Sequence, residues 1–160
     1  MSNRAKSSIR VVFGVALLTA LAACSSTPDK LNGGAGLNSA TPGTTQDFVV
    51  NVGDRVFFDT DSSDLNYSAQ ATLDKQATWL QQYPNYRIAI EGHADERGTR
   101  EYNIALGARR ANSVRNYLVS KGIQSGRLST KSYGKERPVA VCDDISCWSQ
   151  NRRAVTTLAN

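Results

Sequence analysis

The stretch from residue 91 to residue 111, EGHADERGTREYNIALGARRA, holds most of the side chains that could do chemistry in this chain. Asn103, Leu106 and Arg110 are spaced so that they line one face of a helix. At about 100° per residue, that face lies beside the apolar stripe of the helix, where a charged group would border a groove. Asp95 precedes the helix in a loop that follows a strand, a common place for binding residues. An Asp at the entrance of the helix and an Arg two turns into it could therefore face the same cavity.

A carboxylate and a guanidinium a few ångström apart suit a zwitterionic ligand, because Asp accepts from an ammonium group and Arg donates to a carboxylate. Two plainer interpretations stay open on the spacing alone. Asp95 and Arg110 could form an internal salt bridge, or Asp95 could cap the helix that follows it. Spacing alone favours these internal roles over a ligand site.

Catalysis and metal binding find little support in the residue types. His93 is the single histidine, and alternating positions at a strand end explain Glu91, His93 and Asp95 more simply than a metal site does. No Gly-x-Ser-x-Gly segment marks an activated serine. We therefore expect no catalytic residue, no metal and no cofactor.

The N-terminal segment predicts export rather than a membrane span. Arg4, Lys6 and Arg10 precede an apolar run over residues 11–23, which is shorter than the about 20 residues that cross a bilayer. A basic start followed by a short apolar run is typical of a secretory signal peptide. The run ends in Leu-Ala-Ala-Cys at Cys24, which resembles the bacterial lipobox and implies that Cys24 is acylated. The serine that follows resembles the outer-membrane class of lipoproteins.

The chain divides into three predicted parts. Residues 1–23 form the signal peptide. Residues 24–45 form the lipidated N-terminus and a flexible linker, because they are rich in Gly, Ser, Thr, Asn and Pro and have no apolar periodicity. Residues 46–160 have the length of one folded domain.

Charge and cysteine usage narrow the class of protein. The chain has 19 Lys and Arg against 14 Asp and Glu, but three of the cations lie in the signal peptide, so a nucleic-acid partner is not expected. With Cys24 acylated, Cys142 and Cys147 remain as a pair in an oxidising compartment, and we favour a small loop disulfide over free thiols.

The two tryptophans of the predicted domain, Trp79 and Trp148, are interpreted as packing residues.

Apolar periodicity predicts an α/β sandwich. One helix is expected from a cap at Ser68 to Pro84, and a second from a cap at Thr99 to Lys121, with Gly122 as its stop. Strand candidates lie at residues 49–52, 55–58, 87–91, 128–133 and 153–158. Strands that alternate with two helices place the helices in a layer on one sheet.

Four motifs carry a resemblance to the OmpA-like peptidoglycan-binding domains. They are FFDTDSSDL at residues 57–65, the stretch at 91–111, SYGKERP at 132–138 and NRRA at 151–154. With the lipobox and linker, the chain is most similar to the lipoprotein members of that family in the Tol–Pal system. The resemblance implies two main helices packed on one mixed four-stranded sheet.

The resemblance also implies a ligand. In that family the domain binds the peptide stem of uncrosslinked peptidoglycan through meso-diaminopimelate, whose free end carries an amino group and a carboxylate. We expect Asp95 to bind the ammonium and Arg110 a carboxylate. The residues for which the resemblance implies a binding role are Asp61, Asp95, Arg97, Asn103, Leu106 and Arg110.

By the same resemblance, the chain is expected to be a lipid-anchored, non-enzymatic protein of the outer membrane with its domain in the periplasm. It would tether the outer membrane to the cell wall, contact TolB and other Tol proteins, and support envelope integrity and constriction during cell division. A wall-modifying enzyme and an anchored scaffold with incidental wall contact remain as alternatives.

Overall fold

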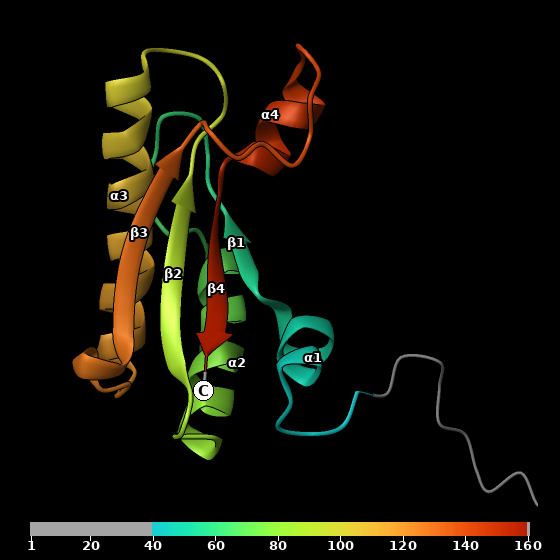
Figure 1. Cartoon of the computed structure of the whole chain (residues 1–160), viewed down its shortest axis with the longest axis vertical. Helices are drawn as coiled ribbons and strands as arrows, with labels where there is room; N and C mark the ends of the chain where they lie inside the picture. The colour runs from blue at the N-terminus through green and yellow to red at the C-terminus, as the bar shows by residue number, and fades with distance from the viewer. Residues whose placement is uncertain (1–39, 160) are drawn as a thin grey trace, which may run out of the picture. The chain divides into compact units, whose positions relative to one another are not determined.

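A computed structural model describes residues 40–159 (Figure 1). The elements in chain order are α1 (Thr45–Asp47), a π-helical turn (Phe48–Gly53), β1 (Arg55–Phe57), α2 (Tyr67–Gln82), β2 (Arg87–His93), α3 (Arg100–Ser120), a 3-10 turn (Ser125–Arg127), β3 (Leu128–Gly134), α4 (Ile145–Asn151) and β4 (Arg153–Ala159). Within these residues, no helix combines the length and apolar character needed to cross a bilayer. The predicted signal peptide and Cys24 lie outside the described residues.

The four strands form one mixed sheet in the order β1-β4-β2-β3. β2 and β3 run parallel, whereas β4 is antiparallel to both β1 and β2. The two long helices, α2 and α3, lie side by side on one face of this sheet (Figure 1). The expected architecture of two main helices on a mixed four-stranded sheet is confirmed.

The hydrophobic core lies between the helical layer and the sheet. Its fully enclosed members come from every layer: Phe48, Leu73, Leu80, Ile88, Ile90, Ala111, Val114 and Leu118. α3 comes closest to the sheet where Gly107 faces Gly92 of β2, because neither residue has a side chain to separate the backbones. This contact fixes the height of α3 above the sheet.

The predicted capping residue is confirmed for α3 and wrong for α2. Thr99 caps α3 as predicted, since its hydroxyl accepts from the backbone nitrogen of Tyr102 at 3.2 Å. Gly122 follows the helix with a positive φ of 93°. The predicted cap of α2 is wrong by two residues, because Asn66, not Ser68, accepts from the nitrogen of Ala69 at 2.9 Å.

The strand predicted at residues 49–52 is wrong. These residues belong to the π-helical turn after α1, which Thr44 caps by accepting from the nitrogen of Asp47. The carboxylate of Asp47 is buried and accepts from the indole nitrogen of Trp79 at 2.8 Å. This long-range contact holds the segment in a helical form despite its β-branched residues.

Residues before the predicted domain start at residue 46 also contact the domain. The hydroxyl of Tyr86 donates to the carbonyl oxygen of Gly43 at 2.8 Å, and the nitrogen of Gly43 donates to Asp47 at 2.9 Å. Because Tyr86 directly precedes β2, the incoming chain is attached at the amino end of that strand. The carboxyl end of β2 lies at the opposite end of the sheet, beside the start of α3 (Figure 1).

Candidate functional site

A cavity of about 250 Å³ opens where β1 and β2 end and α3 begins. β1 and β2 both run antiparallel to β4, so their carboxyl ends meet at the same edge of the sheet. The cavity is lined by Thr60, Asp61, Asp95, Arg97, Gly98, Tyr102, Asn103 and Leu106. Five of the six residues implied by the family resemblance are therefore brought to one cavity.

Asp95 supplies a carboxylate to the cavity and is itself held by two arginines. Arg97 donates from Nη2 at 2.7 Å and from Nε at 3.1 Å, and Arg152 donates from Nη1 at 3.3 Å. Burial is the largest influence on the pKa of Asp95 and raises it. The hydrogen bonds from Arg97 and Arg152 together outweigh burial, so the pKa lies below its ordinary value. Asp95 is therefore an anion at neutral pH.

Arg97 supplies a guanidinium at the mouth of the cavity. Its side chain is 40% exposed although it pairs with Asp95. Its backbone nitrogen also donates to the Asp95 carboxylate at 3.2 Å, which closes a tight turn after β2. The carbonyl oxygen of Arg97 accepts from the amide of Asn103 at 2.8 Å, so α3 holds the same turn from the other side.

Asp61 places a second carboxylate at the mouth. It is exposed and has a φ of 57°, the left-handed region that residues with a side chain rarely adopt. The hydroxyl of Tyr102, from the first turns of α3, donates to its carboxylate. Such strained conformations cluster at functional sites, where surrounding contacts maintain them.

The structure differs from the predicted role of Arg110. This side chain is fully buried and does not line the cavity. Its guanidinium donates to the carbonyl oxygens of Ser62 at 2.8 Å, His93 at 2.8 Å and Asp59 at 3.1 Å. Burial lowers its pKa to about 10, so it still carries a positive charge at neutral pH. Arg110 holds the β1–α2 loop against the end of β2, beneath the charged groups of the cavity.

Two of the three residues on the helix face predicted to border a groove line the cavity. Asn103 and Leu106 are almost fully enclosed, at 2% and 4% exposure, yet both reach the cavity wall. Neither plainer interpretation of Asp95 holds in the described residues. Its partners are Arg97 and Arg152 rather than Arg110, and Thr99 is the residue that caps α3.

Sequence reasoning did not identify several residues of this region. Tyr102 and Thr60 line the cavity, and Arg152 supports Asp95 from the start of β4. Trp148, interpreted as a packing residue, lies with its ring centre 4.2 Å from Cζ of Arg97. The NRRA motif was the one signal that could have indicated Arg152, because it contains adjacent arginines beside a strand.

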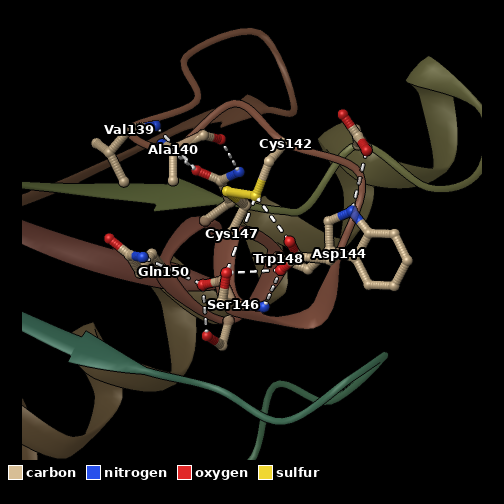
Figure 2. Close-up of a disulfide and its surroundings, with 11 residues drawn as sticks. Val139, Ala140, Cys142, Asp144, Ser146, Cys147, Trp148 and Gln150 are labelled. Carbon is tan, nitrogen blue, oxygen red and sulfur yellow. Dashed lines mark hydrogen bonds between the residues drawn. A yellow bond between two sulfur atoms is a disulfide. The ribbon is translucent and has the colours of Figure 1, made fainter.

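Cys142 and Cys147 are joined by a disulfide with their Cα atoms 5.7 Å apart (Figure 2). The bond lies within the connection between β3 and β4, which contains the unpredicted helix α4. Within residues 40–159, these cysteines and Asp144 form the one cluster of metal-ligating residue types. Because the two sulfurs are bonded to each other, they are not free to act as thiolate ligands.

His93 is an enclosed residue rather than an exposed ligand. It is 2% exposed, and its ring stacks on Tyr133 with centroids 5.5 Å apart. Neither ring nitrogen has a hydrogen-bond partner among the described residues. Burial, helped by the positive charges of Arg153 and Arg137, lowers the pKa of His93 to about 4. The imidazole is therefore neutral at physiological pH.

Comparison with known proteins shows which family has this architecture. A profile described as "OmpA family" matches residues 57–152. A protein named peptidoglycan-associated lipoprotein from Rhizobium meliloti is 64% identical over 152 residues, covering 92% of this chain and 86% of its own. One of the same name from Brucella melitensis is 58% identical and covers 98% of this chain and 96% of its own.

Solved structures agree with this result. The crystal structure of the peptidoglycan-associated lipoprotein from Burkholderia pseudomallei is 42% identical with a TM-score of 0.65, covering 66% of this chain and 90% of that chain. The C-terminal domain of Helicobacter pylori MotB is 25% identical with a TM-score of 0.63, covering 67% and 84%. The chain therefore belongs to the OmpA family, within the group of peptidoglycan-associated lipoproteins.

Proposed function

We propose that this chain is an outer-membrane lipoprotein that binds peptidoglycan non-covalently through the meso-diaminopimelate of its stem peptides. Cys24 would carry the lipid, and residues 46–160 would bind the wall in the periplasm. The observation that carries the proposal is the cavity at the end of β1 and β2. It presents the carboxylates of Asp61 and Asp95 beside the guanidinium of Arg97.

The cavity suits the two charges at the free end of diaminopimelate. Asp61 and Asp95 accept from the ammonium group, and exposed Arg97 donates to the carboxylate. The buried amide of Asn103 and the side chain of Leu106 shape the wall on the α3 side. Arg110 acts from below, where it holds the loops in place and adds positive charge, rather than by contacting the ligand.

The expected affinity of a single domain is modest. Each charge-assisted hydrogen bond contributes about 1.5–3 kcal/mol net, and ordering the ligand offsets part of that gain. A lipid anchor would raise the effective concentration of the domain near the wall, so a weak single contact would still retain the protein there. This arrangement suits a tether that must release and rebind as the envelope is remodelled.

The test is depletion of the purified chain from solution by purified sacculi, followed by titration with a diaminopimelate stem peptide. Asp95→Asn should weaken binding at least tenfold, because a neutral amide cannot pair with an ammonium group. Asp74→Asn is a matched control, since Asp74 is an exposed carboxylate on α2 that pairs with Lys121 and lies outside the cavity. Equal binding by both variants would refute the assignment of Asp95.

The chemistry of the wall gives a second control. A stem peptide with lysine in place of diaminopimelate keeps the ammonium group and lacks the neighbouring carboxylate. We expect it to bind more weakly than the diaminopimelate peptide to the unmodified chain. Arg97→Gln should reduce this difference, because the guanidinium is the group that discriminates between the two peptides.

Two other functions are separated by simple readouts. A wall-modifying enzyme would release soluble fragments from sacculi, whereas a binder would be depleted without releasing any. The resemblance to the Tol–Pal lipoproteins also supports contacts with TolB and other Tol proteins and a role in constriction during cell division. If wall binding is the central activity, soluble stem peptide should compete with TolB for the domain. An anchored scaffold with incidental wall contact should show no such competition.

A further inference from the structure

Helix α4 and the residue that follows it contact both charged partners in the cavity. Trp148 of α4 stacks on the guanidinium of Arg97, with 4.2 Å between Cζ and the ring centre. Arg152, directly after α4, donates to Asp95 at 3.3 Å. None of the residues of α4 lines the cavity itself. The helix therefore supports the Asp95–Arg97 pair from outside the cavity.

The indole of Trp148 is fixed by a second contact. Its Nε1 atom donates to the carboxylate of Glu96 at 2.9 Å, and Glu96 stands between the two cavity residues in the chain. Figure 2 shows the indole extending outward from α4, with this hydrogen bond at its ring nitrogen. The indole of Trp148 therefore contacts the turn after β2 through its ring nitrogen and Arg97 through its ring face.

The position of α4 depends on local bonds, because so short a helix has little stability of its own. The Cys142–Cys147 disulfide joins the helix to the segment before it. Asp144 caps the helix by accepting from the nitrogen of Ser146 at 2.7 Å. Asn151 closes the other end, since its side chain accepts from the backbone nitrogen of Val139 at 2.8 Å. The segment between β3 and β4 is thus held together by its own disulfide and hydrogen bonds.

We propose that Trp148 is a positioning residue for the ligand cavity and that the Cys142–Cys147 disulfide keeps it in place. The disulfide holds α4 in place, and α4 positions the indole against Arg97 and Glu96. Arg97 is thereby kept paired with Asp95, in the geometry that binds a ligand with an ammonium group and a carboxylate. This inference rests on the proposed function, because it assigns a support to that same site. The cost of ordering Arg97 is then met before the ligand arrives.

The experiment measures the dissociation constant of the purified mature chain for the diaminopimelate stem peptide, together with the thermal unfolding midpoint. Trp148→Ala and the double variant Cys142→Ser/Cys147→Ser should bind about 3- to 10-fold more weakly, the loss expected for one cation–π contact. Trp148→Phe keeps the aromatic face and should recover most of the affinity. Gln150→Ala is the matched control, because Gln150 is exposed on the same helix and its side chain bonds only to the carbonyl of Ser146.

A second readout needs no ligand. The titration midpoint of the Asp95 carboxyl group, followed by NMR, should rise in Trp148→Ala, because a released Arg97 no longer stabilises the carboxylate. A purely structural role of Trp148 would lower the unfolding midpoint and leave the Asp95 titration unchanged. Stem-peptide binding equal to that of the unmodified chain in Trp148→Ala and in the double serine variant would overturn the inference.

The two readouts separate this inference from the proposed function. If the unmodified chain fails to bind the stem peptide while the Asp95 titration still responds to Trp148→Ala, the proposed function is wrong and the positioning relationship stands. If the unmodified chain binds and neither readout responds to the variants, the function stands and the positioning role is wrong.

Discussion

The Nη1 atom of Arg110 donates to the carbonyl oxygen of His93 across 2.8 Å inside the domain. The same guanidinium reaches two carbonyl oxygens of the β1–α2 loop, so one side chain joins α3, β2 and that loop. Arg110→Ala would remove these three hydrogen bonds, and the Asp59 carbonyl would keep a second donor, the nitrogen of Ser62 at 3.2 Å. We expect the free energy of unfolding, measured by urea denaturation, to fall by about 3–5 kcal/mol.

The neighbouring arginine is the natural control for that variant. Arg109 is exposed on the same helix, so Arg109→Ala should change the free energy of unfolding by less than about 0.5 kcal/mol. Arg110→Lys, which keeps the charge but loses the planar fork, should fall between the two. Equal stability of Arg110→Ala and the unmodified chain would show that the buried guanidinium is not a structural support.

Gly107 in α3 should tolerate no side chain. A Cβ atom built there would lie 2.8 Å from the carbonyl oxygen of Gly92, which is closer than real contacts allow. Gly107→Ala should therefore push α3 away from the sheet and lower the free energy of unfolding by about 1–3 kcal/mol. In Gly126→Ala the new Cβ would meet nothing within 4 Å, and we expect no comparable loss.

Asp61 should separate stability from binding. Its φ of 57° suits glycine, so Asp61→Gly should change the free energy of unfolding by less than about 1 kcal/mol. Asp61→Ala should be less stable than Asp61→Gly, because alanine has no side-chain group to favour that conformation. Both variants lose the carboxylate at the cavity mouth and should bind the stem peptide more weakly. Full binding by both would exclude Asp61 from the site.

Stability should decrease in mildly acidic solution because of His93. Its pKa in the folded protein is about 4, against 6.5 for an ordinary histidine. Between these values the unfolded chain binds more protons, so the free energy of unfolding should fall as pH is lowered, by at most about 1.4 kcal/mol per unit. The loss should begin near pH 6.5 and level off near pH 4.

The matched variant for this effect is His93→Phe, which keeps an aromatic ring against Tyr133 and does not titrate. Urea denaturation at pH 7 and at pH 5 should show a smaller difference for this variant than for the unmodified chain. An unchanged pH dependence would assign the effect to other groups.

The sequence was most informative where local and long-range signals agree. α3 was predicted within a residue at each end, because Thr99 caps it, its apolar spacing is regular, and Gly122 ends it. The segment at 49–52 was predicted wrongly because its β-branched residues favour a strand. The hydrogen bond from Trp79 to Asp47, 32 residues apart in sequence, decides its conformation and leaves no local signal.

The candidate site shows the same division. Motif position indicated Asp95 and Arg97, and both line the cavity because they lie in the short turn between β2 and α3. Helical spacing located Arg110 on the right face but could not show that the β1–α2 loop covers it. α4 was not predicted, since a helix of this length has no clear periodicity and depends on its cap and disulfide.

The attachment of Gly43 to Tyr86, at one end of β2, sets the direction in which the domain would bear tension. Asp95 follows the other end of the same strand, so a pull between the membrane and a bound wall would run along β2. The hydrogen bonds that join β2 to β3 on one side and to β4 on the other run across the direction of that pull. Such a load shears many hydrogen bonds together instead of unzipping them one by one, so we expect high resistance to mechanical rupture in this direction.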